Sequence, residues 1–173
     1  MTDPRFVYVT YIATTAEKLW QALTDGAFTE QYWFGTRIES DWTVGARVSF
    51  VRNDEVSDYG VVLECDPPRR LSYTWRVEFH EEFRRERPSR VTFEIEAMTA
   101  SAATQRPEVK LTVTHDDFDP DSKVFHAISG GWPLVLASLK SMLETGGGLT
   151  SASVDALKAA KERALAAARD AAA

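Results

Sequence analysis

The stretch that decides the fold is SGGWPLVLASLKSMLETG, which covers residues 129–146. Pro133 suits a first helical turn, where its missing N–H removes no hydrogen bond, and the glycines at 146–148 end the helix. Around this stretch, apolar residues recur at helical spacing and form one face: Phe125, Ile128, Trp132, Val135, Leu136, Leu139, Met142 and Leu143. The sequence therefore predicts a long helix, from about Ser129 to Thr145, that packs on something of similar size.

The surface opposite this helix is a sheet encoded upstream. From residue 36 to residue 118 the pattern alternates between apolar and polar residues, which is typical of antiparallel strands with one dry and one wet face. We expect the dry face to meet the long helix. A first strand is predicted over residues 6–11, and further strands over 37–41, 46–52, 59–65, 70–79, 90–98 and 108–114, with a charged hairpin at 81–89.

Two short helices are expected between the first strand and the rest of the sheet. Thr14 and Glu17 have the spacing of a capping box, which predicts Thr14 as the N-cap of a helix that ends at Asp25 and Gly26. A second short helix is expected at residues 28–33.

Length and composition predict one domain over residues 1–148 and a helical extension over 149–173. The extension is rich in alanine and has a thin apolar stripe of Val154, Leu157, Ala164, Leu165 and Ala168. It packs on the domain, pairs with another copy, or frays. A single cysteine, the lack of a membrane-spanning run and the lack of a signal pattern indicate a cytoplasmic protein. The net charge of −6 makes a nucleic-acid partner improbable.

Motifs for metal or nucleophilic chemistry are weak. No histidine has a second ligand at metal spacing, and residues 117–121 begin like a calcium loop but lack its later glycine and glutamate. No serine lies in a nucleophile elbow. His115 with Asp116 is one candidate acid–base pair, although a buried or surface role is more common for such residues. We therefore predict no catalytic residue, no metal and no cofactor.

The aromatic residues carry a stronger signal. Bulky rings on a curved sheet under a helix commonly line a concave apolar binding site, although each ring alone is as readily explained by core packing. Trp132 is expected to be partly open to such a cavity. The predicted wall residues are Trp33, Phe50, Tyr73, Trp75, Phe93 and Trp132, with His126 as a polar anchor.

The order of a strand, two helices, six strands and a long helix resembles the helix-grip fold of the START/Bet v-like (SRPBCC) superfamily. The phrases at residues 12–25, 40–45, 64–75 and 129–146 are similar to its bacterial branch named after the activator of heat-shock protein 90 ATPase. The resemblance covers about residues 6–146. It implies an α+β fold in which a curved antiparallel sheet wraps around the long C-terminal helix.

Three functions are compatible with this resemblance. The first is a binding protein for a small hydrophobic or amphipathic ligand held between sheet and helix. The second is a chaperone-regulating or stress-response protein with an exposed protein-binding surface. The third is a cyclase- or hydrolase-like enzyme, which requires a titratable group inside the pocket. Fold alone does not choose among them. Separately from these functions, pairing of the C-terminal extension with another copy would give a homodimer.

Overall fold

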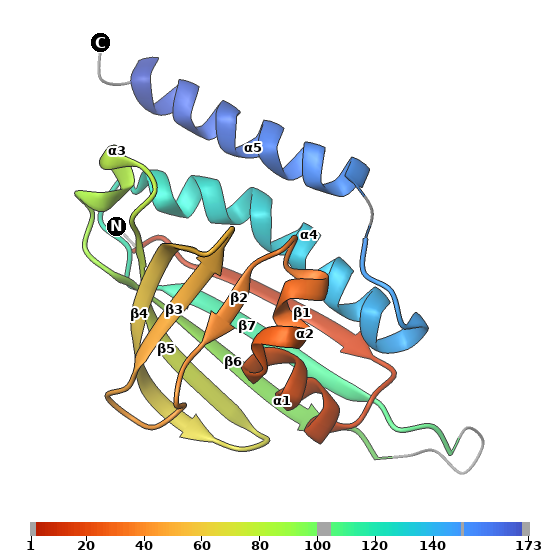
Figure 1. Cartoon of the computed structure of the whole chain (residues 1–173). Coiled ribbons are helices and arrows are strands. Elements are labelled where there is room, and N and C mark those ends of the chain that lie inside the picture. The colour runs from red at the N-terminus through yellow and green to blue at the C-terminus, as the bar shows by residue number, and fades with distance from the viewer. Residues whose placement is uncertain (1–2, 100–104, 150, 171–173) are drawn as a thin grey trace.

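The chain forms one curved antiparallel sheet whose inner face holds a long helix (Figure 1). The computed structural model describes residues 3–99, 105–149 and 151–170. Its seven strands follow the order β1-β7-β6-β5-β4-β3-β2. The elements in chain order are β1 (Phe6–Ile12), α1 (Ala16–Thr24), α2 (Gly26–Tyr32), β2 (Arg37–Glu39), β3 (Arg47–Arg52), β4 (Glu55–Asp66), β5 (Arg70–Val77), α3 (Glu81–Arg84), β6 (Ser89–Ala97), β7 (Val109–Asp116), α4 (Lys123–Thr145) and α5 (Ser151–Asp170). This arrangement confirms the predicted helix-grip fold.

The long helix starts earlier than predicted. Ser122 is its N-cap, and the Ser122 hydroxyl accepts a hydrogen bond from the Phe125 N–H at 3.0 Å. Glu86, from outside the helix, accepts from the Lys123 N–H at 2.8 Å. Because these side chains satisfy the first-turn donors, the helix begins at Lys123 and Pro133 lies inside it rather than in the first turn. The other end is as predicted, with Gly146 in the left-handed region at φ 87°.

The first helix is capped by a different residue from the one predicted. Thr15, rather than Thr14, is the N-cap of α1, and its hydroxyl accepts from the Lys18 N–H at 3.2 Å. Glu17 therefore does not occupy the capping-box position. Asp25 ends α1 and also caps α2 by accepting from the Ala27 N–H at 2.8 Å. This double use of Asp25 lets the second helix follow the first without a loop.

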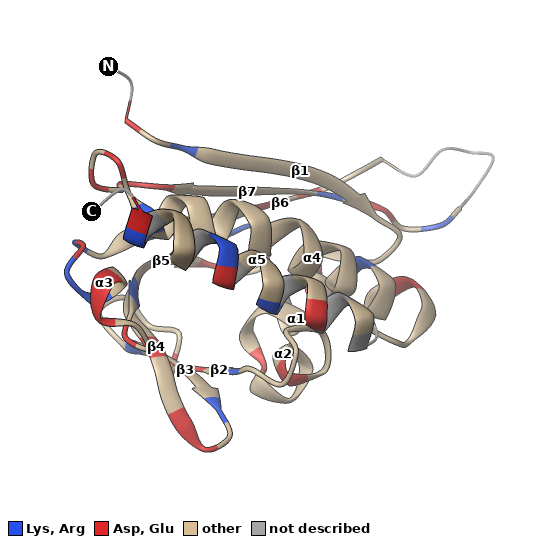
Figure 2. Cartoon of the chain, turned by 90° about the horizontal axis from the view of Figure 1, so that it is seen from above, with Lys and Arg blue, Asp and Glu red and all other residues tan. Residues whose placement is uncertain are grey.

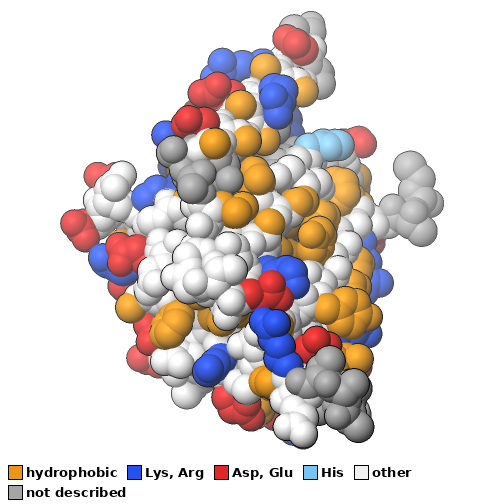
Figure 3. All heavy atoms as spheres, turned by 90° about the vertical axis from the view of Figure 1, so that its right-hand side faces the viewer, with side chains coloured by type: hydrophobic (Ala, Val, Ile, Leu, Met, Phe, Trp, Pro, Cys, Tyr) orange, Lys and Arg blue, Asp and Glu red, His pale blue; other side chains and the backbone are white. Residues whose placement is uncertain are grey.

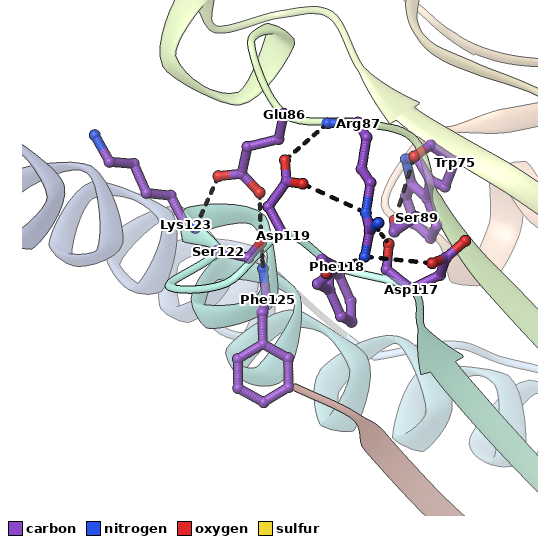
Figure 4. A network of polar contacts seen from close by, with 10 residues as sticks. All are labelled: Trp75, Glu86, Arg87, Ser89, Asp117, Phe118, Asp119, Ser122, Lys123 and Phe125. Carbon is purple, nitrogen blue, oxygen red and sulfur yellow. Dashed lines mark hydrogen bonds and ion pairs between the residues drawn. The ribbon is translucent and has the colours of Figure 1, made fainter. Parts of the chain in front are cut away.

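The charged hairpin predicted at residues 81–89 contains a short helix instead. Phe83 of α3 is buried, while Glu81, Arg84 and Arg85 around it are exposed, so this turn of helix fixes one apolar side chain over the sheet. Beyond α3, Glu86 and Arg87 connect this segment to the loop before α4 (Figure 4). The β5–β6 connection and the start of the long helix are therefore held together.

Helix α5 lies along the side of α4 that faces away from the sheet (Figures 1 and 2). A Cβ placed on Gly130 would lie 3.5 Å from the Ala160 Cβ, so the glycine permits close approach of the two helices. Leu165 packs against the core. Of the stripe predicted for this helix, the side chains of Val154, Leu157, Ala164 and Ala168 lie outside the described residues.

Candidate functional site

A pocket of about 510 Å³ opens between the inner face of the sheet and the first half of α4. This volume is within the range of small-molecule sites, which run from roughly 300 to 1,000 Å³. The lining comes from the segment just after α2, β3, the β3–β4 turn, β4, β5, the α3 segment and α4: Trp33, Thr36, Phe50, Arg52, Asn53, Glu55, Val56, Ser57, Asp58, Trp75, Val77, Glu78, Phe79, Phe83, Val124, Ala127, Ile128, Gly131, Trp132 and Val135.

Four aromatic side chains form one continuous wall of the pocket. The ring centroids of Trp33 and Trp132 lie 5.3 Å apart, and those of Trp75 and Trp132 lie 5.7 Å apart. Phe50 stacks on Trp75 at 4.6 Å. Because the rings contact one another, they form a rigid apolar surface rather than a set of separate clamps. The indole N–H of Trp75 is buried and donates to none of the described residues.

The polar part of the lining lies where β3 turns into β4. The pairing of these strands shifts between Phe50 and Val51, so that Asp58 lies opposite Phe50 while Glu55 lies opposite Arg52. Ser57 is the extra residue of this bulge, and it brings both carboxylates onto the face that lines the pocket. The otherwise apolar pocket therefore has charged groups of both signs at this side: the Arg52 guanidinium and the carboxylates of Glu55 and Asp58.

The structure separates the predicted site residues into two groups. Trp33, Phe50, Trp75 and Trp132 line the pocket. Tyr73 and Phe93 are buried in the core at 2% and 1% exposure, outside the lining. His126 is exposed and also outside the lining, because the pocket-facing positions of α4 follow the helical repeat through Val124, Ala127, Ile128, Gly131 and Val135. Of the predicted wall residues, only the first group borders the pocket.

Several lining residues were not among the predicted ones. Val124 was within reach of sequence reasoning, because it lies four residues before Ile128, and Ala127 lies inside the span of the predicted apolar face. Arg52, Asp58 and Thr36 had no such signal. Their position depends on a strand bulge and on pairing between distant segments, which the local pattern does not encode.

His115 lies in the core beneath the aromatic wall. Its Nδ1 accepts from the Trp132 Nε1–H at 3.0 Å, so in the neutral ring Nε2 carries the proton and donates to the Ser89 hydroxyl at 2.7 Å. The Ser89 hydroxyl in turn donates to the Trp75 carbonyl oxygen at 3.2 Å. Burial lowers the pKa of His115 to about 3. With no free acceptor nitrogen, His115 does not act as a base toward Ser89.

The proposed pairing of His115 with Asp116 is not present. Adjacent residues of a strand point to opposite faces, and Asp116 lies on the outer face, where it binds Arg90 at 2.9 Å. His115 points inward, toward Trp132. The two side chains therefore do not share a site.

The acidic loop at residues 117–121, before α4, forms ion pairs with Arg87 from the β5–β6 connection (Figure 4). The Arg87 guanidinium lies 3.4 Å from carboxylate oxygens of both Asp117 and Asp119, and it also donates to the Phe118 carbonyl oxygen at 2.6 Å. The loop thus anchors the β5–β6 connection. Among the described residues, no group of His, Cys, Asp and Glu side chains is arranged to hold a metal ion. In the same part of the chain, no helix has the length and apolar character needed to cross a membrane.

Solved structures with the same fold come from several organisms. A protein from Mesorhizobium loti is 25% identical with a TM-score of 0.64, and the match covers 80% of this chain and 96% of that one. The Aha1 dimer of Colwellia psychrerythraea is 21% identical with a TM-score of 0.64, covering 83% and 98%. An HSP90 activator from Plasmodium falciparum is 22% identical with a TM-score of 0.58, covering 74% and 86%.

None of the proteins with curated functions matches this sequence. The sequence profile of one family, described as activator of Hsp90 ATPase homolog 1-like protein, matches residues 13–144. This range begins at the residue after β1 and ends in the last turn of α4, so it includes every element that lines the pocket. The chain belongs to the activator of Hsp90 ATPase homolog 1-like family.

Proposed function

We propose that this protein binds a small apolar or amphipathic ligand in the pocket between the sheet and α4. The observation that carries the proposal is the aromatic wall of Trp33, Phe50, Trp75 and Trp132, which borders an open volume of about 510 Å³. The four rings are themselves buried, at 1–9% exposure, and they form a firm apolar wall against which a ligand can bury its own apolar surface. A cytoplasmic location is part of this proposal.

Native mass spectrometry of freshly purified protein tests the proposal, since it reports a retained ligand and the number of subunits together. The Colwellia relative is a dimer, and we propose the same assembly for this chain.

The matched variants for ligand binding are Ala127→Phe, which adds a ring inside the pocket, and Ala137→Phe, which adds the same ring to an exposed position of the same helix. We expect ligand retention in the wild type and Ala137→Phe, and loss in Ala127→Phe. Equal retention in both variants would contradict the pocket assignment.

A second function, regulation of a chaperone, is favoured by the outer face of β1. This edge strand has no charged residue between Phe6 and Ile12 (Figure 2). Its side chains Val7, Val9 and Tyr11 are 51%, 46% and 54% exposed. One similar structure is an HSP90 activator. Exposed apolar strips of this kind commonly bind other proteins. On the side of the molecule shown in Figure 3, apolar and charged side chains both reach the surface.

Chaperone regulation is tested by adding the protein to a bacterial Hsp90 and measuring ATP hydrolysis. The informative variant is Val9→Lys, and its control is Val44→Lys, at a turn position that is 70% exposed. If the proposal is correct, the wild type and the control change the ATPase rate and Val9→Lys does not. An unchanged rate with the wild type would remove this function from consideration.

A further inference from the structure

We infer that the pocket selects ligands with an anionic head group, and that Arg52 binds this group. The inference rests on the proposed ligand-binding function and assigns the ligand a chemical class: an apolar body that carries a carboxylate or phosphate. Arg52 is the last residue of β3 and lines the pocket together with the aromatic wall.

The Arg52 side chain is held in position by a neutral group. Its Nε and Nη2 donate to the Thr36 hydroxyl oxygen at 3.1 and 2.6 Å. Thr36 is only 2% exposed, so the hydroxyl is a fixed anchor. Among the residues that the structure describes, no carboxylate forms an ion pair with Arg52. A guanidinium fixed by a hydroxyl keeps its full charge and spare N–H donors for an anion.

The acidic side chains of the lining are engaged differently. Glu78 forms an ion pair with Arg76 at 2.9 Å, and Asp58 accepts from the Glu78 backbone N–H at 3.3 Å. Glu55 is exposed at the turn, where solvent screens its charge. Arg52 is therefore the charged group of the lining that is both fixed and without an ionic partner within the described chain.

The shape of the lining gives the rest of the ligand. Beyond Arg52 the walls are the aromatic rings on one side and Val124, Ala127 and Ile128 of α4 on the other. Such walls bind an alkyl or ring system through burial of apolar surface. A head group at Arg52 leaves this body of the ligand against Trp33, Trp75 and Phe50.

The experiment compares four probes that share a ten-carbon chain: decanoate, decyl phosphate, decanol and decylamine. Binding is measured near neutral pH by the intrinsic fluorescence of the tryptophans in the wall and by calorimetry. We expect decanoate and decyl phosphate to bind at least about tenfold more tightly than decanol, with decylamine the weakest, as charge-assisted hydrogen bonds to a guanidinium predict. The ratio between the two anions shows which head group fits better.

Arg52→Gln is the test variant, and Arg47→Gln is its matched control on the same strand, because Arg47 is exposed and outside the lining. The anion preference should disappear in Arg52→Gln and persist in Arg47→Gln. Thr36→Val, which removes the anchor but keeps the charge, should weaken anion binding less than Arg52→Gln, and thermal melts verify that each variant is folded. Equal binding of all four probes would overturn the anionic inference and leave the proposed function intact. No binding of any probe would contradict the proposed function itself.

Discussion

At the scale of single residues, His115 couples protonation to folding. Its pKa is about 3 in the folded chain, below the ordinary value of 6.5 that applies when the chain is unfolded. Between these values the unfolded chain binds a proton and the folded chain does not, so the His115 contribution is fully present above pH 6.5 and is lost as the pH falls toward 3. The slope is at most about 1.4 kcal/mol per pH unit.

Urea unfolding of the wild type and His115→Gln at a series of pH values measures this contribution. We expect the stability difference between them to shrink as the pH is lowered from 6.5. His126→Gln serves as a control, because His126 is exposed. A difference that stays constant over this range would show that His115 does not titrate as a buried group.

Trp132 is buried at 3% exposure, so it is less open to the pocket than expected from the sequence. Trp132→Phe keeps most of the apolar contact but leaves the buried Nδ1 of His115 without a donor, and we expect it to cost about 1–3 kcal/mol. Trp20→Phe is the comparison, since the Trp20 indole donates no hydrogen bond within the described part of the chain. Urea denaturation compares the two variants. Equal costs would mean that the Trp132–His115 bond contributes nothing to stability.

At the scale of elements, β4 and β5 approach each other closely at Gly60. A Cβ on this residue would lie 1.7 Å from the Thr74 carbonyl oxygen, which belongs to backbone and cannot rotate away. Gly60→Ala should therefore reach or exceed the upper end of the roughly 1–3 kcal/mol that overpacking costs. Gly147→Ala is the control, because no atom lies within 4 Å of its added Cβ. Stability is measured by urea unfolding, and a cost below that of the control would contradict the close approach.

The start of α4 depends on one carboxylate from another segment. Glu86 accepts from the Lys123 N–H at 2.8 Å (Figure 4). It also accepts from the Val124 N–H at 3.3 Å. Glu86→Ala should cost about 0.5–2 kcal/mol, as the loss of an N-cap does. Glu81→Ala removes only an exposed ion pair with Arg85 and should cost less than about 0.5 kcal/mol. Thermal melts of both variants measure these costs. Equal decreases in melting temperature would refute the capping role of Glu86.

At the scale of the whole molecule, α5 is an addition to the fold. Its contacts are mainly with α4, and the family match ends at residue 144, before α5 begins. Truncation after Gly148 should leave a folded domain with a modest loss of stability, or convert a dimer to a monomer if α5 joins two copies. Circular dichroism and size-exclusion chromatography measure both effects. Complete loss of folded protein would place α5 in the core of the domain.

The fold could be predicted from the sequence because the patterns that indicate its strands and helices are local and repeated. Alternation in β5 and the helical repeat in α4 each extend over several residues, so single errors do not change the assignment. Sequence reasoning missed the start of α4, because it took Pro133 as a mark of the first turn and did not use Ser122 as an N-cap; the additional cap by Glu86 comes from far away in the chain. It also placed Tyr73 and Phe93 in the binding wall, because a pattern identifies the inward face of a strand but not which inward residues meet a neighbour and which meet a pocket.

The position of β1 has a consequence for how the chain folds as it is synthesised. Its pairing partner is β7, and Phe6 lies opposite His115. The two strands are therefore neighbours in the sheet but are separated in the sequence by its other strands. The first strand leaves the ribosome long before this partner exists, and joining the two requires closure of a very large loop. Such non-local pairing slows folding, and an uncharged strand that waits unpaired is a site for self-association. Completion of the sheet by β7 is thus the step that removes this hazard.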